Sequence, residues 1–446
     1  MTTLSSTRPP NLGATHIDDS EFNDSKNIAL IRDRQRHLGN SILFYHDPIH
    51  IVRGEGVWLF DESGRAYLDC YNNVPSVGHC NPRVVKAMTD QAALLNTHTR
   101  YLHRSVVEYA KQLTSVMPGD LKVCMFVCTG SEANELAVRI ARAITGNRGG
   151  IVMESSYHGN TTLISELSTF DSQAPKRPPH VIAVEPPNTY RGPYRRGEAS
   201  LGEKYAGLVD AAIAELESRG QRTAAFLCDA IFDSQGGLEA PPDYFQRVYE
   251  KVRRAGGLCI ADEVQPGLGR TGKMWGFEHY DVVPDIVTLG KPLGNGHPMA
   301  AVVTTPAIAK RFAASTVYFN TFGGNPVSAE IGKAVLDCIE SDALVESARV
   351  RGAYLRKGLE DLARTHPIIG NVRGLGLYQA IELVLDRQTR EPAVAIARQL
   401  PDKMKEEGIL LGLAGRYGNV LKMRPPLVFS KDNADQLLGV LDRVLP

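Results

Sequence analysis

The chain has 446 residues, and its fifty Lys and Arg residues balance fifty Asp and Glu residues, so that its formal net charge is zero. Apolar residues make up 43% and charged residues 22%, which excludes a disordered or fibrous chain. A neutral chain also lacks the overall positive field that attracts nucleic acid, so we expect no nucleic-acid partner. A chain of this length buries about three quarters of its surface and can fold without a disulfide or a metal.

The seven cysteines form no CxxC pair, and most of them lie inside apolar runs such as Val123–Cys128. We interpret them as buried thiols in a reducing compartment. The N-terminus lacks the basic and apolar segments of a secretion signal, and no apolar stretch approaches 18 residues. These features predict a cytoplasmic protein without a membrane partner or a metal site.

Residues 1–40 are polar and are predicted to form an arm with one short helix. Residues 51–70 alternate apolar and polar side chains around a turn at 61–64, which predicts a hairpin. Beyond it, short apolar runs alternate with helical patterns, and this alternation predicts a parallel sheet covered on both faces. The runs are Val123–Cys128, Gly150–Glu154, Val181–Glu185, Ala224–Asp229, Leu258–Asp262, Ile286–Leu289 and Ala300–Thr304, and the helical patterns include Ser131–Ile144, Tyr205–Ser218 and Tyr244–Ala255.

From Val327 a long helical stretch is followed by short strands, a further helix and a final strand and helix. We therefore predict an α/β protein in three parts. An N-terminal arm and hairpin occupy 1–75, a large domain with a mainly parallel sheet occupies 76–326, and a smaller α+β domain occupies 327–446. The first part is expected to pack with the small domain.

Ligands of such sheets bind beyond the carboxyl ends of the strands, so the residues there are candidates for a functional site. Gly130 and Ser131 open a helix after the first run, where backbone N–H groups suit a phosphate, although Ser131 could equally be an ordinary helix cap. Tyr157 follows the second run and offers a flat face either to an aromatic ligand or to the protein core. The Thr321 hydroxyl, which lies close to Gly323 in a glycine-containing turn, is a second candidate for a phosphate contact.

Asp262 ends the fifth apolar run, and a carboxylate there needs a cation or a donor as its partner. That partner is either a salt-bridging side chain or a protonated ligand. Lys291 follows the sixth run, and Pro292 is expected to hold it in extended backbone, so that its side chain projects at the strand end. A lysine with a lowered pKa is a nucleophile for Schiff-base chemistry, whereas an ordinary lysine extends its charge into solvent.

A phosphate-binding helix start, a flat ring, a buried carboxylate and a lysine at one sheet edge are the parts of a pyridoxal phosphate site. With these parts assigned, the sequence resembles the class III (ω-) aminotransferase family, which are fold type I pyridoxal phosphate enzymes. The matching stretches are GSEANE at 130–135, YHG at 157–159, DEVQPGLGRTG at 262–272, LGKPLGNG at 289–296 and NTFGGNP at 320–326. The resemblance is closest to the branch that holds phosphoethanolamine and phosphohydroxylysine phospholyases and diamino-acid transaminases.

The resemblance implies a role for each matching residue. Lys291 would bind pyridoxal 5'-phosphate as a Schiff base and move protons, while Asp262 would pair with the pyridinium nitrogen. Gly130 and Ser131 would bind the cofactor phosphate. The side chains that cover the two ring faces, and the one near the ring hydroxyl, would be Tyr157, Val264 and Gln265. Thr321 would bind the phosphate in the neighbouring subunit, which implies a homodimer with shared active sites.

Two departures from the family bear on the reaction. The arginine that grips the α-carboxylate in many amino-acid transaminases is replaced by Lys422, and a segment that often reads EPIQGEGG differs heavily at 229–237. An ammonium lacks the planar bidentate fit of a guanidinium to a carboxylate. The chain therefore lacks the usual 2-oxoglutarate anchor.

We predict a phospholyase that eliminates phosphate from a small phosphorylated amine, O-phosphoethanolamine, to give acetaldehyde, ammonia and phosphate. The alternative is a transaminase of an ω-amine or a diamino acid that uses 2-oxoglutarate or pyruvate. A phosphate leaving group needs nearby cations. The candidates are Lys422, Arg424 and Arg270, with Arg100 and His103 as weaker ones, and each of them could instead form a surface ion pair.

Overall fold

The computed structural model describes residues 14–15, 25–39, 43–170 and 177–446 of the chain. Most of the polar arm predicted at 1–40 lies outside the described residues, and the described part holds the predicted short helix, α1 (Ile28–Leu38). Within the described ranges no helix is long and apolar enough to cross a membrane. The cytoplasmic location stays a prediction.

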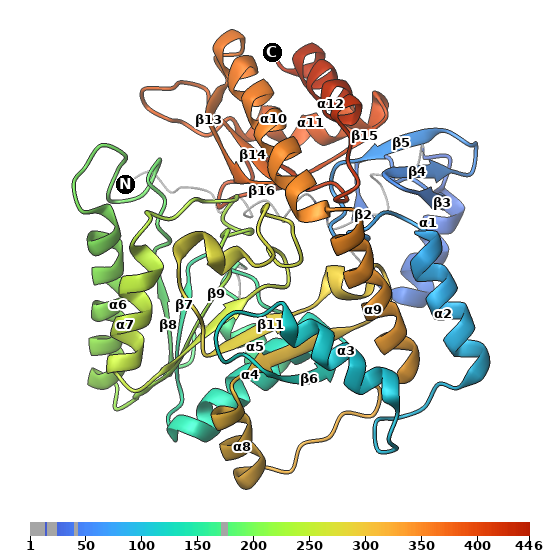
Figure 1. The fold of residues 1–446 in the computed structure, drawn as a ribbon. Coiled ribbons are helices and arrows are strands. Elements are labelled where there is room, and N and C mark those ends of the chain that lie inside the picture. Colours follow the sequence, from blue (N-terminus) through green and yellow to red (C-terminus); the bar gives the residue numbers. More distant parts are fainter. Residues whose placement is uncertain (1–13, 16–24, 40–42, 171–176) are drawn as a thin grey trace.

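A seven-stranded sheet forms the centre of the molecule, as the alternation of apolar runs and helical patterns predicts (Figure 1). All of its strands run parallel except β12, which lies antiparallel between β6 and β11. The order across the sheet is β6 (Val123–Val127), β12 (Ala300–Thr304), β11 (Ile286–Leu289), β10 (Leu258–Asp262), β9 (Thr223–Cys228), β7 (Gly149–Met153) and β8 (Val181–Val184).

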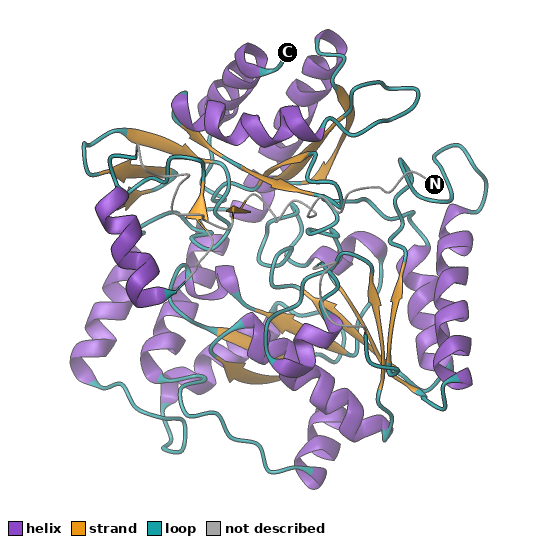
Figure 2. Cartoon of the chain, turned by 180° about the vertical axis from the view of Figure 1, so that it is seen from behind, coloured by secondary structure: helices purple, strands orange, loops and turns teal. Residues whose placement is uncertain are grey.

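Helices cover both faces of this sheet, because successive strand residues point to opposite sides and both sets are apolar. Val302 packs on the side of α4, whereas Ala301 and Val303 belong to the core cluster of the other side. Figure 2 shows helices on either side of the strands. One face carries α4 (Gly130–Thr145), α5 (Thr162–Leu167) and α8 (Pro306–Ser315), and the other carries α3 (Arg104–Ser115), α9 (Pro326–Ser341), α6 (Leu201–Ser218) and α7 (Tyr244–Arg254).

The predicted N-terminal hairpin is present and is extended by a third strand. The turn at 61–64 joins β4 (Trp58–Asp61) to β5 (Ala66–Asp69), and β3 (Ile51–Glu55) pairs with the outer edge of β4. On its other edge β5 pairs in parallel with β15 (Ile409–Leu410), which ties this sheet to the C-terminal part. Two further features lie in the N-terminal part of the chain. Strand β1 (Ala14–Thr15) pairs with β2 (Leu43–Phe44), and helix α2 (Pro82–Leu94) packs against α9.

The long helical stretch predicted after Val327 is broken into two helices. Helix α9 ends at Ser341, and α10 (Leu344–Thr365) begins after Ala343, whose positive φ of 48° interrupts the helical path. The C-terminal sheet is antiparallel, in the order β13 (Ile369–Leu375), β14 (Tyr378–Leu383), β17 (Val420–Met423) and β16 (Gly412–Ala414), and it is accompanied by α11 (Val394–Glu406) and α12 (Lys431–Val444). The proposed domain boundaries after residues 75 and 326 stay predictions.

Helix α10 fixes the position of the C-terminal sheet over the large one. Gly352 of α10 lies directly against the carbonyl of Gly376, in the turn between β13 and β14. That turn in turn meets the loop after β10, where Leu377 N–H donates to the Arg270 carbonyl at 3.0 Å. The close contact at Gly352 therefore links the position of α10 to that of a loop at the edge of the large sheet.

We expect Gly352→Ala to lower the free energy of unfolding by about 1–3 kcal/mol, because a Cβ there would overlap the Gly376 carbonyl oxygen. The matched control is Gly207→Ala in α6, where a Cβ would meet no atom within 4 Å. That change should stabilise the chain by about 1 kcal/mol through helix propensity. Urea unfolding of both variants measures the difference, and equal effects would contradict the packing of α10 described here.

Candidate active site

A cavity of about 200 Å³ lies at the carboxyl edge of the large sheet. It is lined by Gly130, Ser131, Asn134, Tyr157, His158, Gly159, Asp229, Asp233, Ser234, Asp262, Val264, Gln265 and Lys291. The structure thus brings together all of the sequence-predicted cofactor residues except Thr321. The predicted substrate cations do not line the cavity.

The start of α4 forms one wall of this cavity. Thr129 is the N-cap: its hydroxyl accepts from the Glu132 N–H at 3.2 Å, and the Glu132 carboxylate accepts from the N–H groups of Cys128 and Thr129. Ser131 is therefore not the cap, and its hydroxyl instead donates to the Asn160 side chain at 3.1 Å. The capping box fixes the helix start and leaves Ser131 beside the cavity, at the positive end of the helix dipole.

Two glycines keep this wall open to a ligand. A Cβ on Gly130 would lie 3.1 Å from the Val264 side chain. Gly159 has a φ of 141°, which other residues rarely adopt, and a Cβ on it would lie 2.6 Å from the Ser131 hydroxyl. Larger residues at either position would fill the space that a phosphate needs next to the helix start.

The buried carboxylate of Asp262 is held by a network that the sequence did not indicate. Asp262 is 5% exposed, and its Oδ2 lies 2.7 Å from Nδ1 of His158 and accepts from the Asn134 amide at 2.9 Å. Its Oδ1 accepts from the Val264 N–H at 3.1 Å. Asn134 is itself fixed, because its own oxygen accepts from the Thr288 hydroxyl at 2.7 Å. Both partners lie in the motifs that carry the family resemblance, within 130–135 and 157–159, which is the signal that could have found them.

Lys291 begins the 3₁₀ turn Lys291–Gly294 after β11, and its φ is 30°. The prediction that Pro292 holds Lys291 in extended backbone is therefore wrong. A positive φ outside glycine costs about 1–3 kcal/mol and commonly marks a functional site. The side chain nevertheless reaches the cavity, as predicted.

Burial and the positive charge of Arg424 together lower the pKa of the Lys291 amine to about 8. The carboxylates of Asp233 and Asp262 act in the opposite direction. A second shifted group faces the same space: burial, with the neighbouring Asp233 and Asp262 carboxylates, raises the pKa of Asp229 to about 7. Such shifts at a sheet edge are typical of catalytic sites.

Lys422 and Arg424 meet at the carboxylate of Asp233, which does line the cavity. The Lys422 ammonium lies 3.2 Å from Asp233, and the Arg424 guanidinium lies 3.6 Å from it. Arg424 also donates to the Tyr71 carbonyl at 2.8 Å, but its buried Nη1 has no hydrogen-bond partner among the described residues. The single carboxylate of Asp233 faces two positive charges, and these hold its pKa well below its usual range.

The other predicted cations lie elsewhere. Arg270 is buried and donates to the backbone carbonyls of Leu377 and Pro425, so it joins loops of the two sheets. Arg100 stacks on the Phe319 ring at 4.0 Å, and the His103 ring contacts the Ser105 hydroxyl at 2.7 Å at the start of α3. Within one chain none of these three side chains lines the cavity. Thr321 is exposed and also lies outside it.

Gln265 connects the cavity to the N-terminal strands. Its side-chain nitrogen donates to the Asp233 carboxylate at 3.4 Å, and its oxygen accepts from the Asn73 amide. Asp233 and Asn73 were both absent from the sequence-based set of site residues. Asp233 lies in the segment at 229–237 where the chain departs from the family pattern, so the departure itself was the available signal.

Comparisons with known proteins agree with this geometry. The aminotransferase class-III family profile matches residues 44–445. A phospholyase from Arthrobacter, solved in complex with phosphoethanolamine, is 45% identical and has a TM-score of 0.90. The match covers 94% of this chain and 100% of that one. An alanine–glyoxylate aminotransferase 2-like protein of Drosophila melanogaster is 44% identical over 92% of this chain and 85% of its own length. An ethanolamine-phosphate phospho-lyase homolog of Caenorhabditis elegans is 39% identical over 93% of both chains.

The chain belongs to the class-III aminotransferase family, and it has the fold of the fold type I pyridoxal phosphate enzymes. The family and its solved members imply pyridoxal 5'-phosphate as the cofactor. The cavity fits that group, because it offers an open helix start for a phosphate, a lysine of lowered pKa and a pinned carboxylate. Tyr157 and Val264 also line it, as two ring-stacking side chains would. The role of each individual residue stays a prediction.

We expect the cofactor-free protein to take up pyridoxal 5'-phosphate covalently at a rate that rises with pH, is half-maximal near pH 8 and levels off above it. Only the neutral amine of Lys291 is nucleophilic, and its pKa is lowered to about 8. The measurement is the rate at which visible absorbance appears between pH 6 and pH 10. A free lysine derivative should continue to gain rate up to its pKa of about 10.4.

The matching control is Lys291→Ala. This variant should lack the visible absorbance that borohydride bleaches in the parent protein. If it keeps that absorbance, Lys291 is not the residue that binds the cofactor. A parent protein whose rate is still rising at pH 10 would contradict the lowered pKa.

Proposed function

We propose that this enzyme is a phospholyase that converts O-phosphoethanolamine and water into acetaldehyde, ammonia and phosphate. The observation that carries the proposal is the placement of two buried cations, Lys422 and Arg424, on the single carboxylate of Asp233 at the cavity wall. When Lys422 is protonated, the cluster holds one positive charge more than Asp233 neutralises; burial and the neighbouring Arg424 lower the pKa of Lys422 to about 8. An anion with more than one negative charge, such as a phosphate monoester, complements it.

The residues divide the work according to their positions. The bound cofactor would supply an electron-accepting ring, and Asp262, fixed by His158 and Asn134, would keep that ring protonated. Lys291, released from the cofactor by the substrate amine, would remove a proton from the carbon that bears nitrogen. Its lowered pKa suits this step, because the amine is substantially neutral near pH 8. The carbon–oxygen bond to phosphate then breaks, and water completes the release of aldehyde and ammonia.

The phosphate would compete with Asp233 for the two cations. The buried Nη1 of Arg424 makes no hydrogen bond among the described residues and only a 3.6 Å ion-pair contact to Asp233, so the phosphate would replace a long contact rather than a hydrogen bond there. Charge-assisted bonds from Lys422 and Arg424 would stabilise the negative charge that develops as phosphate leaves. The Arthrobacter enzyme, whose structure holds phosphoethanolamine, supports this substrate class.

A transaminase of an ω-amine or a diamino acid, with 2-oxoglutarate or pyruvate, is the second candidate. It is favoured by the Drosophila relative, whose name assigns it to the aminotransferases. The same Lys291 and Asp262 would serve that reaction. Lys422 argues against this reaction, because a lysine shared with Asp233 is a poorer anchor for a keto-acid carboxylate than a free arginine.

Two assays separate these functions. The holoenzyme incubated with O-phosphoethanolamine alone should release phosphate, ammonia and acetaldehyde in equal amounts, since elimination needs no keto acid. In parallel, alanine and a diamine are each tested with pyruvate and with 2-oxoglutarate. Amino transfer without phosphate release would overturn the phospholyase proposal.

Lys422→Met tests the proposed phosphate contact within the same assay. Loss of one charged hydrogen bond, about 1.5–3 kcal/mol, should raise KM for O-phosphoethanolamine about ten- to a hundredfold and leave the cofactor absorbance unchanged. Arg424 remains as a partner for Asp233, so the fold should persist. Lys357→Met is the matched control, because Lys357 is an exposed residue of α10 and its removal should change nothing. An unchanged KM for Lys422→Met would remove this residue from the site.

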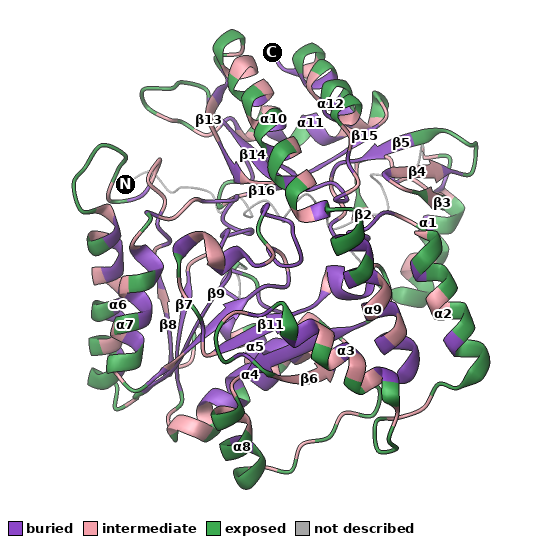
Figure 3. Cartoon of the chain, in the orientation of Figure 1, coloured by how far each residue is buried: buried purple, intermediate pink, exposed green. Residues whose placement is uncertain are grey.

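We further propose a homodimer in which Thr321 reaches the partner's cavity. In one chain Thr321 is exposed, and it follows helix α8, which is mostly exposed (Figure 3), in a segment with several exposed apolar side chains. Arg100 stacks on Phe319, and this contact places the segment around Arg100, which also has exposed apolar side chains, beside the segment that holds Thr321. The exposed apolar residues of the two segments are Leu94, Leu95, Tyr101, Leu102, Val317, Phe319 and Phe322. Large exposed apolar side chains gathered on neighbouring segments are typical of a protein interface.

Sedimentation of the parent protein should give the mass of two chains. Leu102→Asp should dissociate it, because Leu102 is fully exposed in the single chain and a charge there would have to be buried. Leu385→Asp, at an exposed position outside both segments, is the control and should remain dimeric. The shared site is tested by mixing Lys291→Ala with Thr321→Ala chains, which should restore one tight cofactor site per mixed dimer. A monomeric parent, or no restoration on mixing, would rule out the shared site.

A further inference from the structure

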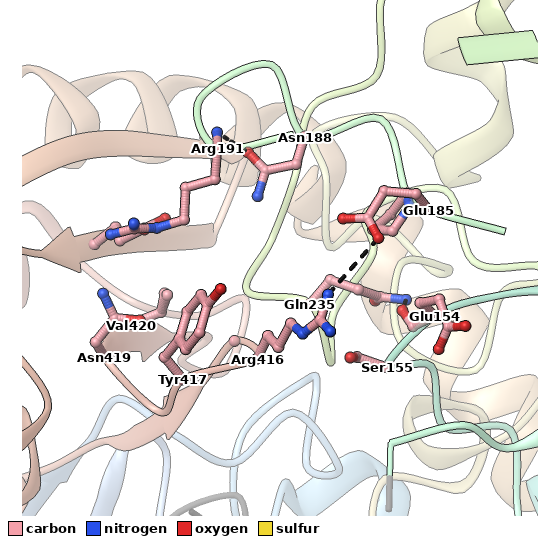
Figure 4. A pocket seen from close by; sticks show the side chains of 13 residues that line it. Glu154, Ser155, Glu185, Asn188, Arg191, Gln235, Arg416, Tyr417, Asn419 and Val420 are labelled. Carbon is pink, nitrogen blue, oxygen red and sulfur yellow. Dashed lines mark hydrogen bonds and ion pairs between the residues drawn. The ribbon is translucent and has the colours of Figure 1, made fainter. Parts of the chain in front are cut away.

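A second pocket lies beside the cofactor cavity, between the large sheet and the C-terminal sheet (Figure 4). Residues at the carboxyl ends of β7 and β8 form one side of it, and the turn between β16 and β17 forms the other. Its lining consists of Glu154, Ser155, Glu185, Pro186, Asn188, Arg191, Gln235, Glu382, Gly415, Arg416, Tyr417, Asn419 and Val420. None of these residues lines the cofactor cavity, although Gln235 directly follows Ser234, which does.

One end of this pocket lacks a hydrogen-bond donor. Gln235 is 6% exposed, and its nitrogen donates to the Glu154 carbonyl at 3.0 Å, but its buried Oε1 has no partner among the described residues. The Glu185 carboxylate faces the same end, and its only ion pair among them is a 3.7 Å contact to the largely exposed Arg416. The pKa of Glu185 is raised by burial and by the nearby Glu154 carboxylate, so a further positive charge would be stabilised here.

The other end of the pocket lacks a hydrogen-bond acceptor. Arg191 donates through Nε to Glu382, but the same carboxylate also binds Arg373 at 2.6 Å. Two guanidinium groups therefore share one negative charge. The buried Nη2 of Arg191 has no hydrogen-bond partner in the described part of the chain. Leaving such a charged donor unpaired is costly, and an anionic acceptor would relieve that cost.

We propose that this pocket binds a small zwitterionic amino acid, with its carboxylate at Arg191 and its ammonium at Glu185 and Gln235. A ligand with only one charged group would satisfy one orphaned atom and leave the other buried and unpaired. Figure 4 shows Arg191 and Tyr417 on one side of the pocket and Glu185 and Glu154 on the other, so the two groups of the ligand must be separated. This site is distinct from the proposed catalytic one.

The ligand would also connect two parts of the protein. Its proposed partners Arg191, Glu185 and Gln235 all follow strands of the large sheet, and Arg191 is held by the carboxylate of Glu382, which belongs to the C-terminal sheet. A molecule that binds only when both sides are in place stabilises that arrangement by mass action. The turn at 233–235 carries Asp233 into the cofactor cavity and Gln235 into this pocket, so occupancy bears directly on the position of the cation cluster.

The test uses holoenzyme in which borohydride has fixed the cofactor to the chain, so that amines cannot react in the cofactor cavity. Calorimetric titration with glycine, 4-aminobutanoate and 6-aminohexanoate scans the distance between ammonium and carboxylate. Butylamine and butanoate are the one-ended comparisons. At least one zwitterion should bind about tenfold more tightly than either one-ended compound.

Glu185→Gln should weaken that binding about tenfold, because it removes the charge that meets the ammonium. Arg416→Gln should leave the affinity unchanged or raise it, since Arg416 competes with the ligand for Glu185. Glu217→Gln, at an exposed position of α6, is the matched control and should bind as the parent does. Circular dichroism checks that all three variants fold. The proposal is overturned if no zwitterion binds more tightly than the one-ended compounds, or if Glu185→Gln binds as well as the parent.

Discussion

The hydrogen-bonded carboxylate of Asp262 is the constraint around which the site is arranged. A buried carboxylate is costly unless charged or polar groups surround it, and here His158, Asn134 and the Val264 N–H do so. These partners come from the loop after β7, from α4 and from the residues that follow β10. One buried charge therefore joins two loops and helix α4, whose start is fixed by its own capping box.

The neutral net charge of the chain conceals a concentration of buried charge at this one edge. Asp229, Asp233, Asp262 and Lys291 line one cavity, and two further cations stand behind Asp233. Burial, with smaller contributions from the neighbouring charges, brings the pKa of the Lys291 amine to about 8 and that of the Asp229 carboxyl to about 7. Proton transfer between groups of similar pKa is efficient, so this crowding is useful for a reaction that must move protons in both directions.

The segment at 229–237 differs heavily from the family pattern, and its residues contact two different sites. Asp233 meets Lys422 and Arg424 on one side, while Gln235 closes the neighbouring pocket on the other. Arg373 also donates to the Gly236 carbonyl at 2.8 Å, so the segment is held by the C-terminal sheet. A change of specificity within the family can therefore arise from a few residues that join the two sheets, without any change in the cofactor residues.

The sequence by itself determined the mainly parallel sheet and the helix start at Gly130 and Ser131, because apolar periodicity and helix-start signals are local in the chain. The roles of Lys291 and Asp262 are implied by the family resemblance and stay predictions. Local reasoning failed at Lys291, which has a positive φ of 30° at the start of a 3₁₀ turn although Pro292 follows it. Only the tertiary structure showed that Asp233, and not Lys422 or Arg424, faces the cavity. It also showed that Arg270 serves two backbone carbonyls. The partner of a buried charge is chosen by contacts between segments far apart in sequence, and no pattern within a single segment encodes that choice.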